Sequence, residues 1–166
     1  MRKLWLTFTA MLLCSIASFA QFGGGTGSQT DPYLISDTAQ FKAIANLGST
    51  SGIYFKLTAD IDLGDLGTVT SAIIPTTFSG TLDGDGYKIS YTVESAVSDG
   101  NFGLFGSVSG TVKNLNITAT ATITGEANNV GLLCGSLTGR IENCRALNCV
   151  VNSTIPTNNG KGIHVG

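Results

Sequence analysis

The sequence predicts an all-β fold in which about three to four repeats stack as the coils of a solenoid. Three observations lead to this prediction: a segment that returns after about thirty residues, a strand with strict alternation of apolar and polar residues, and an unusual composition. Charged residues make up only 12% of the chain, which contains 22 glycines. A surface of neutral polar groups with many glycines is typical of a β protein with frequent turns.

The repeat is clearest between residues 102–115 and residues 131–144. The first segment reads F-G-L-F-G-S-V-S-G-T-V-K-N-L and the second reads G-L-L-C-G-S-L-T-G-R-I-E-N-C. The equivalent positions are Gly106 and Gly135, Gly110 and Gly139, Val112 and Ile141, and Asn114 and Asn143. The same period reaches back to residues 79–82 and forward to residues 162–166, where a further repeat begins. Because one repeat buries its apolar face only against its neighbours, we expect Val112 and Ile141 to face a shared core.

Residues 117–124 form the clearest predicted strand. Its apolar positions are Ile117, Ala119, Ala121 and Ile123. They alternate with four threonines, so one face of the strand is apolar and the other is polar. In the next repeat, the positions equivalent to Thr118, Thr120 and Thr122 are occupied by Leu147, Cys149 and Val151. Because these are not threonines, we interpret the threonine row as ordinary exposed strand surface and not as an ice-binding face.

Two asparagines mark the corner that follows a strand in successive repeats. Asn114 and Asn143 occupy the same place in the aligned segments. Asparagine tolerates the left-handed backbone conformation that a sharp corner needs. Stacked asparagines can also hydrogen-bond along an array of strands. The sequence therefore predicts an asparagine ladder along one corner of the solenoid.

Residues 1–20 are predicted to be a secretory signal peptide. A basic start precedes an apolar run, and the small residues Ser18 and Ala20 favour cleavage before Gln21. The apolar run is short for a membrane span, which needs about 20 residues. We therefore expect the chain to be exported, and the mature chain not to insert into a membrane.

Between the signal peptide and the repeats, the sequence predicts a lead and a cap. Residues 21–30 are Gly-rich and are expected to be flexible. Residues 31–51 contain T-A-Q-F-K-A-I-A-N-L, whose apolar residues have helical spacing and which Ser36 or Asp37 would cap. A solenoid needs an atypical end unit over its first coil, so we expect this short helix to be the N-terminal cap. Residues 52–166 would then form the repeats, the last of them incomplete and uncapped.

Charge and cysteine content limit the partners. The formal net charge is −2 at pH 7, and lysines and arginines do not cluster, which argues against nucleic acid and anionic membrane partners. The cysteines beyond the signal peptide are Cys134, Cys144 and Cys149. The first two align with Phe105 and Leu115, so we interpret them as small core residues. The alternative, a disulfide that joins Cys144 to Cys149 or to Cys134, is also compatible with the sequence. We predict no cofactor.

Two groups of aspartates are candidate metal ligands or catalytic residues. They are Asp60, Asp62 and Asp65, and Asp83 and Asp85. Close carboxylates can bind calcium or act as acid and base in sugar hydrolysis, but the D-G-D-G sequence is explained equally well as a turn. The acidic residue that ends a calcium loop is missing, the single histidine His164 aligns with Leu133, and Arg140 and Arg145 align with outward positions. We therefore predict turns here, with neither a metal site nor a catalytic site.

These motifs resemble a known family. N-F-G-L-F-G-S-V-S-G-T-V-K-N-L-N-I and N-V-G-L-L-C-G-S-L-T-G-R-I-E-N-C resemble the GLUG repeat, named for its Gly-Leu-x-Gly pattern. Y-F-K-L-T-A-D-I-D-L and F-S-G-T-L-D-G-D-G-Y-K-I resemble the segment before such repeats, and D-P-Y-L-I-S-D-T-A-Q-F-K-A-I-A-N resembles their N-terminal lead. The resemblance implies a right-handed parallel β-helix, similar to pectin-lyase-like solenoids, on secreted or cell-surface bacterial proteins. It brings no shared catalytic residues.

The sequence therefore predicts a secreted, non-enzymatic, adhesin-like module of a bacterial surface. It would display a rigid β-helical face to glycans or extracellular proteins, although the sequence does not identify the binding residues. The alternatives are a polysaccharide-degrading enzyme on a pectin-lyase-like scaffold and a structural stalk beside a peptidase domain. The uncapped last coil is expected to be disordered after about Val151 or to self-associate.

Overall fold

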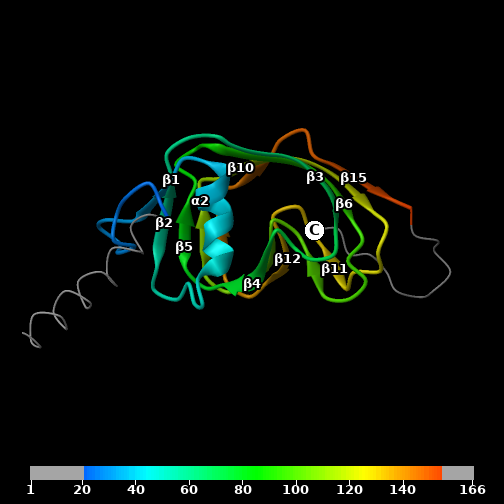
Figure 1. Ribbon diagram of the computed structural model, residues 1–166, viewed down its shortest axis with the longest axis horizontal. Coiled ribbons are helices and arrows are strands. Elements are labelled where there is room, and N and C mark those ends of the chain that lie inside the picture. The colour runs from blue at the N-terminus through cyan, green and yellow to red at the C-terminus, as the bar shows by residue number, and fades with distance from the viewer. Residues whose placement is uncertain (1–20, 155–166) are drawn as a thin grey trace, which may run out of the picture.

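The structure is a computed structural model, and it describes residues 21–154. The chain forms a parallel β-solenoid of about 4 turns, with one short helix on its N-terminal side (Figure 1). This confirms the predicted fold class. The predicted signal peptide, the repeat expected at residues 162–166 and His164 lie outside the described residues. None of the helices within residues 21–154 is long and apolar enough to cross a membrane.

Three parallel sheets form the walls of the solenoid. Sheet A contains β1 (Tyr33–Ile35), β2 (Tyr54–Leu57), β5 (Thr81–Asp83), β9 (Thr111–Lys113) and β13 (Arg140–Glu142). Sheet B contains β3 (Ile61–Val69), β6 (Lys88–Ser95) and β10 (Asn116–Ile123), with both β14 (Arg145–Ala146) and β15 (Val150–Ser153) paired to β10. Sheet C contains β4 (Ile74–Phe78), β8 (Phe105–Val108) and β12 (Cys134–Leu137). A short ladder joins β7 (Asn101–Phe102) to β11 (Asn129–Val130).

The register of sheet A confirms the alignment of the repeats. Val112 of β9 pairs with Leu82 of β5 on one side and with Ile141 of β13 on the other. Leu82 and Val112 are fully buried, whereas Ile141 is half-buried because it lies on the last described coil. The equivalent residues of successive repeats therefore lie on adjacent coils, as the sequence predicts, and Leu82 and Val112 belong to one buried core.

Strand β10 shows the predicted alternation, with every second residue buried. One detail of the predicted register of this sheet was wrong. Ile117 pairs with Ala146, but Thr120 pairs with Val150 and Ala121 with Val151. One extra residue is accommodated between β14 and β15, where Asn148 adopts a left-handed conformation with φ 52°. Val151 therefore stacks on an alanine and not on a threonine.

The first coil holds the helix in place of strands from sheets B and C. Helix α2 (Thr38–Ala43) continues into the 3-10 helix η1 (Ile44–Asn46), and both lie between β1 and β2 in the chain. The Asp37 carboxylate accepts a hydrogen bond from the Gln40 amide at 2.8 Å and so caps the helix. Phe41 is fully buried and meets the ring of Phe105 edge-on at 6.1 Å. The helix is the N-terminal cap that the sequence predicts, and Figure 1 shows it in front of the coils.

The Gly-rich residues 21–30 are not a free lead, which corrects the expectation of flexibility. Backbone hydrogen bonds join Gly23 and Gly24 to Leu34 at 2.8 and 3.0 Å. Phe22 is only 6% exposed and stacks on Tyr33, with 4.7 Å between the ring centroids. This segment therefore pairs with the edge of β1 and extends the aromatic core by one layer.

Candidate functional site

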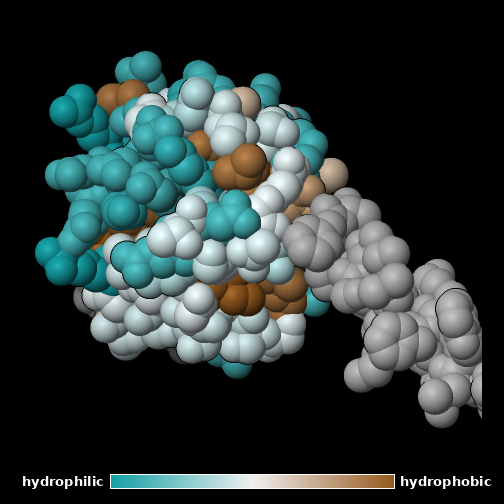
Figure 2. Space-filling model, turned by 90° about the vertical axis from the view of Figure 1, so that its left-hand side faces the viewer, coloured by the Kyte–Doolittle hydropathy of each residue, from teal (hydrophilic) through white to brown (hydrophobic). Residues whose placement is uncertain are grey.

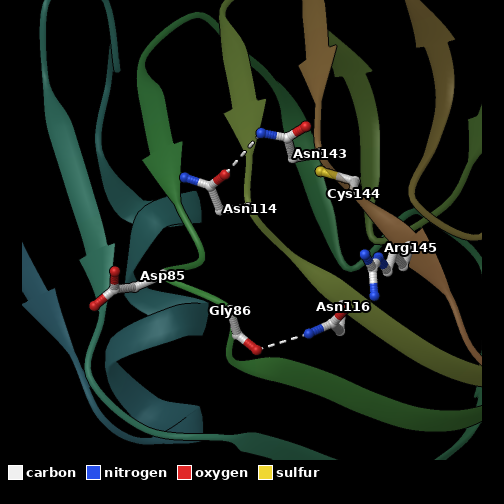
Figure 3. Close-up of a pocket in the computed structure, with 7 residues that line it drawn as sticks. All are labelled: Asp85, Gly86, Asn114, Asn116, Asn143, Cys144 and Arg145. Atoms are coloured by element: carbon white, nitrogen blue, oxygen red, sulfur yellow. Dashed lines mark hydrogen bonds between the residues drawn. The ribbon is translucent and has the colours of Figure 1, made fainter.

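The strongest candidate site is a polar groove along the corner that joins sheets A and B. We call it the corner groove, and its volume is about 440 Å³. Its lining residues are Asp85, Gly86, Asn114, Asn116, Asn143, Cys144 and Arg145. They come from three successive coils, and their polar groups lie around one opening (Figure 3). The groove therefore follows the repeat and is not confined to a single loop.

The backbone at this corner is left-handed in each of the three coils. The φ angle is 49° at Asp85, 54° at Asn114 and 50° at Asn143. Aspartate and asparagine enter this region more readily than other non-glycine residues, because their short polar side chains can bond locally. The predicted corner role of both asparagines is therefore confirmed, and Asp85 fills the same role one coil earlier.

The predicted asparagine ladder is also present. The Asn143 side-chain amide donates to Oδ1 of Asn114 at 3.3 Å, and the Asn114 amide donates to Oδ1 of Asp83 at 3.0 Å. A second hydrogen bond joins two coils within the corner groove: the Asn116 side-chain amide donates to the Gly86 carbonyl at 2.6 Å. These bonds hold the amides in fixed orientations. Arg145 is exposed and forms no ion pair with any residue of the described chain, so its guanidinium is available to a ligand.

Lysines from neighbouring coils neutralise the aspartates beside the corner groove. Lys113 lies 3.1 Å from Asp83, and Lys56 lies 3.1 Å from Asp85. Partial burial works to raise the pKa of Asp83, but hydrogen bonds from Asn114, from the backbone amide of Asp85 and from Lys113 outweigh it and lower the pKa. The hydrogen bond to Asp85 raises the pKa of Lys56. These shifts favour the charged forms of Asp83 and Lys56.

A second hollow lies on the outer face of sheet A. We call it the face pocket, and it has a volume of about 360 Å³. It is lined by Gln29, Pro32, Tyr54, Phe55, Lys56, Thr81, Asp83 and Lys113. The ion pair of Lys56 and Asp85 links it to the corner groove. Figure 2 looks onto this side of the molecule and shows hydrophilic surface gathered over one half of it.

The remaining candidate aspartates serve local structure. Asp60 accepts a hydrogen bond from the Lys88 amide at 2.8 Å, and Asp62 accepts one from the Ser90 hydroxyl at 3.0 Å. Within the D-G-D-G segment, Asp83 accepts a bond from the Asp85 amide at 3.0 Å, which is the turn that the sequence predicts. Within residues 21–154, no three or more His, Cys, Asp or Glu side chains gather so as to hold a metal ion.

The cysteines and arginines lie where the repeat alignment puts them. Cys134 and Cys144 are half-buried free thiols that pack against the core, and burial raises the pKa of both. Cys149 is a third free thiol, and its side chain donates to the Ile117 carbonyl at 3.5 Å. Arg140 pairs with Thr111 and Arg145 with Asn116, so both arginines are outward and exposed.

Sequence reasoning missed a second polar ladder and the lining of the corner groove. The Asn129 amide donates to Asn101 at 2.8 Å, and the Asn128 amide donates to Asp99 at 2.9 Å. The signal was present, because an asparagine precedes each Gly-Leu motif in the aligned repeats. The gathering of Asn116 and Arg145 around one opening depends on the path of the chain at the corner, and no spacing in the sequence reports it.

These features place the chain in the class of parallel β-solenoids with polar ladders at their corners. Among known proteins, it is 33% identical over 135 residues to Halomucin from Haloquadratum walsbyi and 34% identical over 161 residues to a putative Gly-rich membrane protein from Evansella cellulosilytica. The alignments cover 72% and 83% of this chain, but only 2% and 18% of the two relatives. The chain therefore spans less than a fifth of either relative. It matches no protein-family model, and no solved structure matches it.

Proposed function

We propose that this chain is a secreted, adhesin-like surface module that binds glycans through the corner groove and the face pocket, without catalysing a reaction. The β-solenoid fold and the similarity to a putative membrane protein are compatible with a surface-displayed module. Export through the predicted signal peptide, and kinship with GLUG-repeat proteins of bacterial surfaces, are parts of this proposal.

The main support for the proposal is that the corner groove and the face pocket lie next to each other and are linked by the ion pair of Lys56 and Asp85. Sugar hydroxyls need hydrogen-bond donors and acceptors fixed in space, and sugar rings pack against aromatic faces. The corner groove supplies the amides of Asn114 and Asn116 and the guanidinium of Arg145. The face pocket adds the partly exposed ring of Tyr54 and the side chain of Lys113. An extended glycan across sheet A would therefore meet an aromatic surface and then a polar corner.

The rigidity of the solenoid supports display as the mechanism. The ladder fixes Asn114 and Asn143, and the parallel strands of sheet A fix the spacing between successive coils. A ligand that binds such a surface does not have to order it first, which lowers the entropic cost of binding. Each coil adds similar groups at a regular interval, so weak contacts can add along a polymer.

The state of the aspartates supports the absence of catalysis. A general acid in sugar hydrolysis needs a raised pKa so that it carries a proton at working pH. The pKa of Asp83 is lowered instead, and lysines neutralise both Asp83 and Asp85. We infer that these carboxylates position lysines and amides and do not transfer protons.

A glycan-binding array, followed by titration of the best ligand, tests the proposal. We expect Arg145→Ala and Tyr54→Ala each to weaken binding by about tenfold, because each removes a contact worth about 1–2 kcal/mol. Lys42→Ala is the matched control, since Lys42 is an exposed cation on the capping helix. Circular dichroism would establish that each variant is folded.

Either of two results would contradict the proposal and favour another function. No binding to any glycan, with intact fold, would favour a structural stalk. Release of reducing ends or unsaturated products from a polysaccharide, abolished by Asp83→Ala, would show the alternative function of a polysaccharide-degrading enzyme.

A further inference from the structure

We propose that Asp99 is a modification site, at which the folded protein converts aspartate into isoaspartate through a cyclic imide formed with the backbone of Gly100. The reaction needs no enzyme and no reactant besides water. Both residues lie in the connection between β6 and β7. Neither of them lines the corner groove or the face pocket, so the inference is independent of the proposed glycan binding.

The sequence contains three Asp-Gly pairs, which begin at Asp83, Asp85 and Asp99. An aspartate cyclises when the backbone nitrogen of the next residue attacks its side-chain carboxyl group. A glycine at that next position favours the reaction, because it has no side chain to hinder the approach and its backbone is the most adaptable. The sequence alone therefore ranks the three pairs equally, and the structure distinguishes them.

At the third pair, the attacking nitrogen already contacts the carboxyl group. The Gly100 amide donates a hydrogen bond to Oδ1 of Asp99 at 2.9 Å. The Asp99 side chain is exposed and forms no ion pair within residues 21–154. A Cβ atom placed on Gly100 would meet nothing within 4 Å, so the backbone there has room to close a ring. The reacting groups are therefore adjacent and unobstructed.

Asn128, on the next coil, holds this pair in position. Its side-chain amide donates to Oδ1 of Asp99 at 2.9 Å, and its backbone amide donates to the Gly100 carbonyl at 2.7 Å. Both halves of the reacting pair are thus fixed by one residue. Holding two reacting groups in one arrangement lowers the entropic cost of the step that joins them. The stacking of the coils therefore favours ring closure at Asp99.

The same stacking protects the other two Asp-Gly pairs. The Gly84 amide donates to the Lys113 carbonyl and the Gly86 amide to the Asn114 carbonyl, each at 2.8 Å. Either nitrogen could attack the preceding carboxyl group only after it broke this bond between coils. The two carboxylates are also paired with lysines, as described above. Cyclisation at these pairs therefore requires local unfolding.

The reaction balances with water alone. The Gly100 nitrogen bonds to Cγ of Asp99 in its acid form, and the carboxyl hydroxyl leaves as water with the amide proton. Water then adds to a carbonyl carbon of the five-membered imide. Addition at the main-chain carbonyl breaks its bond to nitrogen, which regains a proton, and the chain then runs through Cβ and Cγ as isoaspartate. Addition at Cγ restores aspartate.

Peptide mapping after long incubation of the folded protein tests the inference. Trypsin cuts after Lys88 and Lys113, so Asp99 is the single aspartate of the peptide 89–113, whereas the other two Asp-Gly pairs lie on the peptide 57–88. Isoaspartate has the same mass as aspartate but separates by chromatography. We expect about tenfold more of it, or a still larger excess, per Asp-Gly pair on peptide 89–113. Incubation in urea should bring the three pairs to similar levels, because unfolding removes the contacts that distinguish them.

A variant and a chemical trap complete the test. Asp99→Glu keeps the charge but would need a six-membered ring, so the new product on peptide 89–113 should disappear. Hydroxylamine, which cleaves a chain at a cyclic imide, should release a fragment that begins at Gly100. Equal isoaspartate at all three pairs of the folded protein, or none on peptide 89–113, would overturn the proposal. This comparison is made within the original protein, so it holds even where the variant fails to fold.

Discussion

The side chain of Asn143 donates a hydrogen bond to Oδ1 of Asn114, 3.3 Å away on the preceding coil. Both residues have left-handed backbones, with φ angles of 50° and 54°. One residue type therefore turns the chain and also ties each turn to the next. This coupling explains why the corner is both sharp and regular, and it leads to the first prediction.

Replacement of Asn114 separates its two roles. Asn114→Gly keeps the left-handed turn without steric cost but loses the ladder, so we expect a loss of about 1 kcal/mol in the free energy of unfolding. Asn114→Ala loses the ladder and also strains the backbone, which should cost about 1–2 kcal/mol more. Urea denaturation measures both. Equal stability of the two variants would show that the backbone conformation contributes nothing.

Gly110 allows a close approach between neighbouring coils. A Cβ atom at this position would collide with the backbone of Ser79 and Gly80 on the coil before it. We expect Gly110→Ala to cost about 3 kcal/mol or more, or to prevent folding, because backbone cannot move aside as a flexible side chain can. Gly48→Ala is the control, since a Cβ there meets nothing within 4 Å. Thermal unfolding followed by circular dichroism compares the two, and a folded Gly110→Ala protein of normal stability would contradict the stacking.

The lowered pKa of Asp83 predicts an acid-dependent loss of stability. Its contribution is present above the ordinary carboxyl pKa of 3.8 and is lost as pH falls through the lower value of the folded state. Asp83→Asn should therefore be less stable than the original protein at pH 7, by about 1 kcal/mol or less because Asp83 is only partly buried and water screens its ion pair. The difference should shrink below about pH 3.8. Denaturation at several pH values measures it, with Asp65→Asn as a control whose carboxylate has no lysine partner in residues 21–154.

Because Cys134 and Cys144 are partly buried, we predict that their thiols are alkylated slowly. The raised pKa of Cys134 and Cys144 lowers the fraction of reactive thiolate. We expect both to react with iodoacetamide at pH 8 much more slowly in the folded protein than in urea, as mass spectrometry of peptides would show. The structure has Cys134, Cys144 and Cys149 as free thiols. A protein lighter by two hydrogens that resists alkylation until it is reduced would instead show a disulfide.

The repeat alignment predicted the register of sheet A because it compares segments that have the same role in successive coils. The pairing of Val112 with Ile141 follows from two segments that share residue classes at the same offsets. The buried face of β10 follows in the same way from its alternation. The cap at Asp37 is a local signal, and the helix starts beside it. Each of these features is decided within one segment or by the repetition of a segment.

Features that join unlike segments were harder to predict. Residues 21–30 look flexible because glycines dominate them, yet Phe22 docks on Tyr33 and the backbone pairs with Leu34. The extra residue at Asn148 shifts the register within sheet B, although the sequence spacing indicated a constant offset. In both cases the outcome depends on which neighbouring edge is free, and a sequence pattern does not contain that information.

The sequence by itself determined the stacked coils, the apolar interior and the asparagine corners, because each depends on a period that repeats along the chain. Only the tertiary structure decided that Asn114, Asn116 and Arg145 surround one groove. The reason is geometric. A repeat fixes how each coil follows the last, but the groups that gather at a corner or at an end depend on how separate coils are placed in three dimensions.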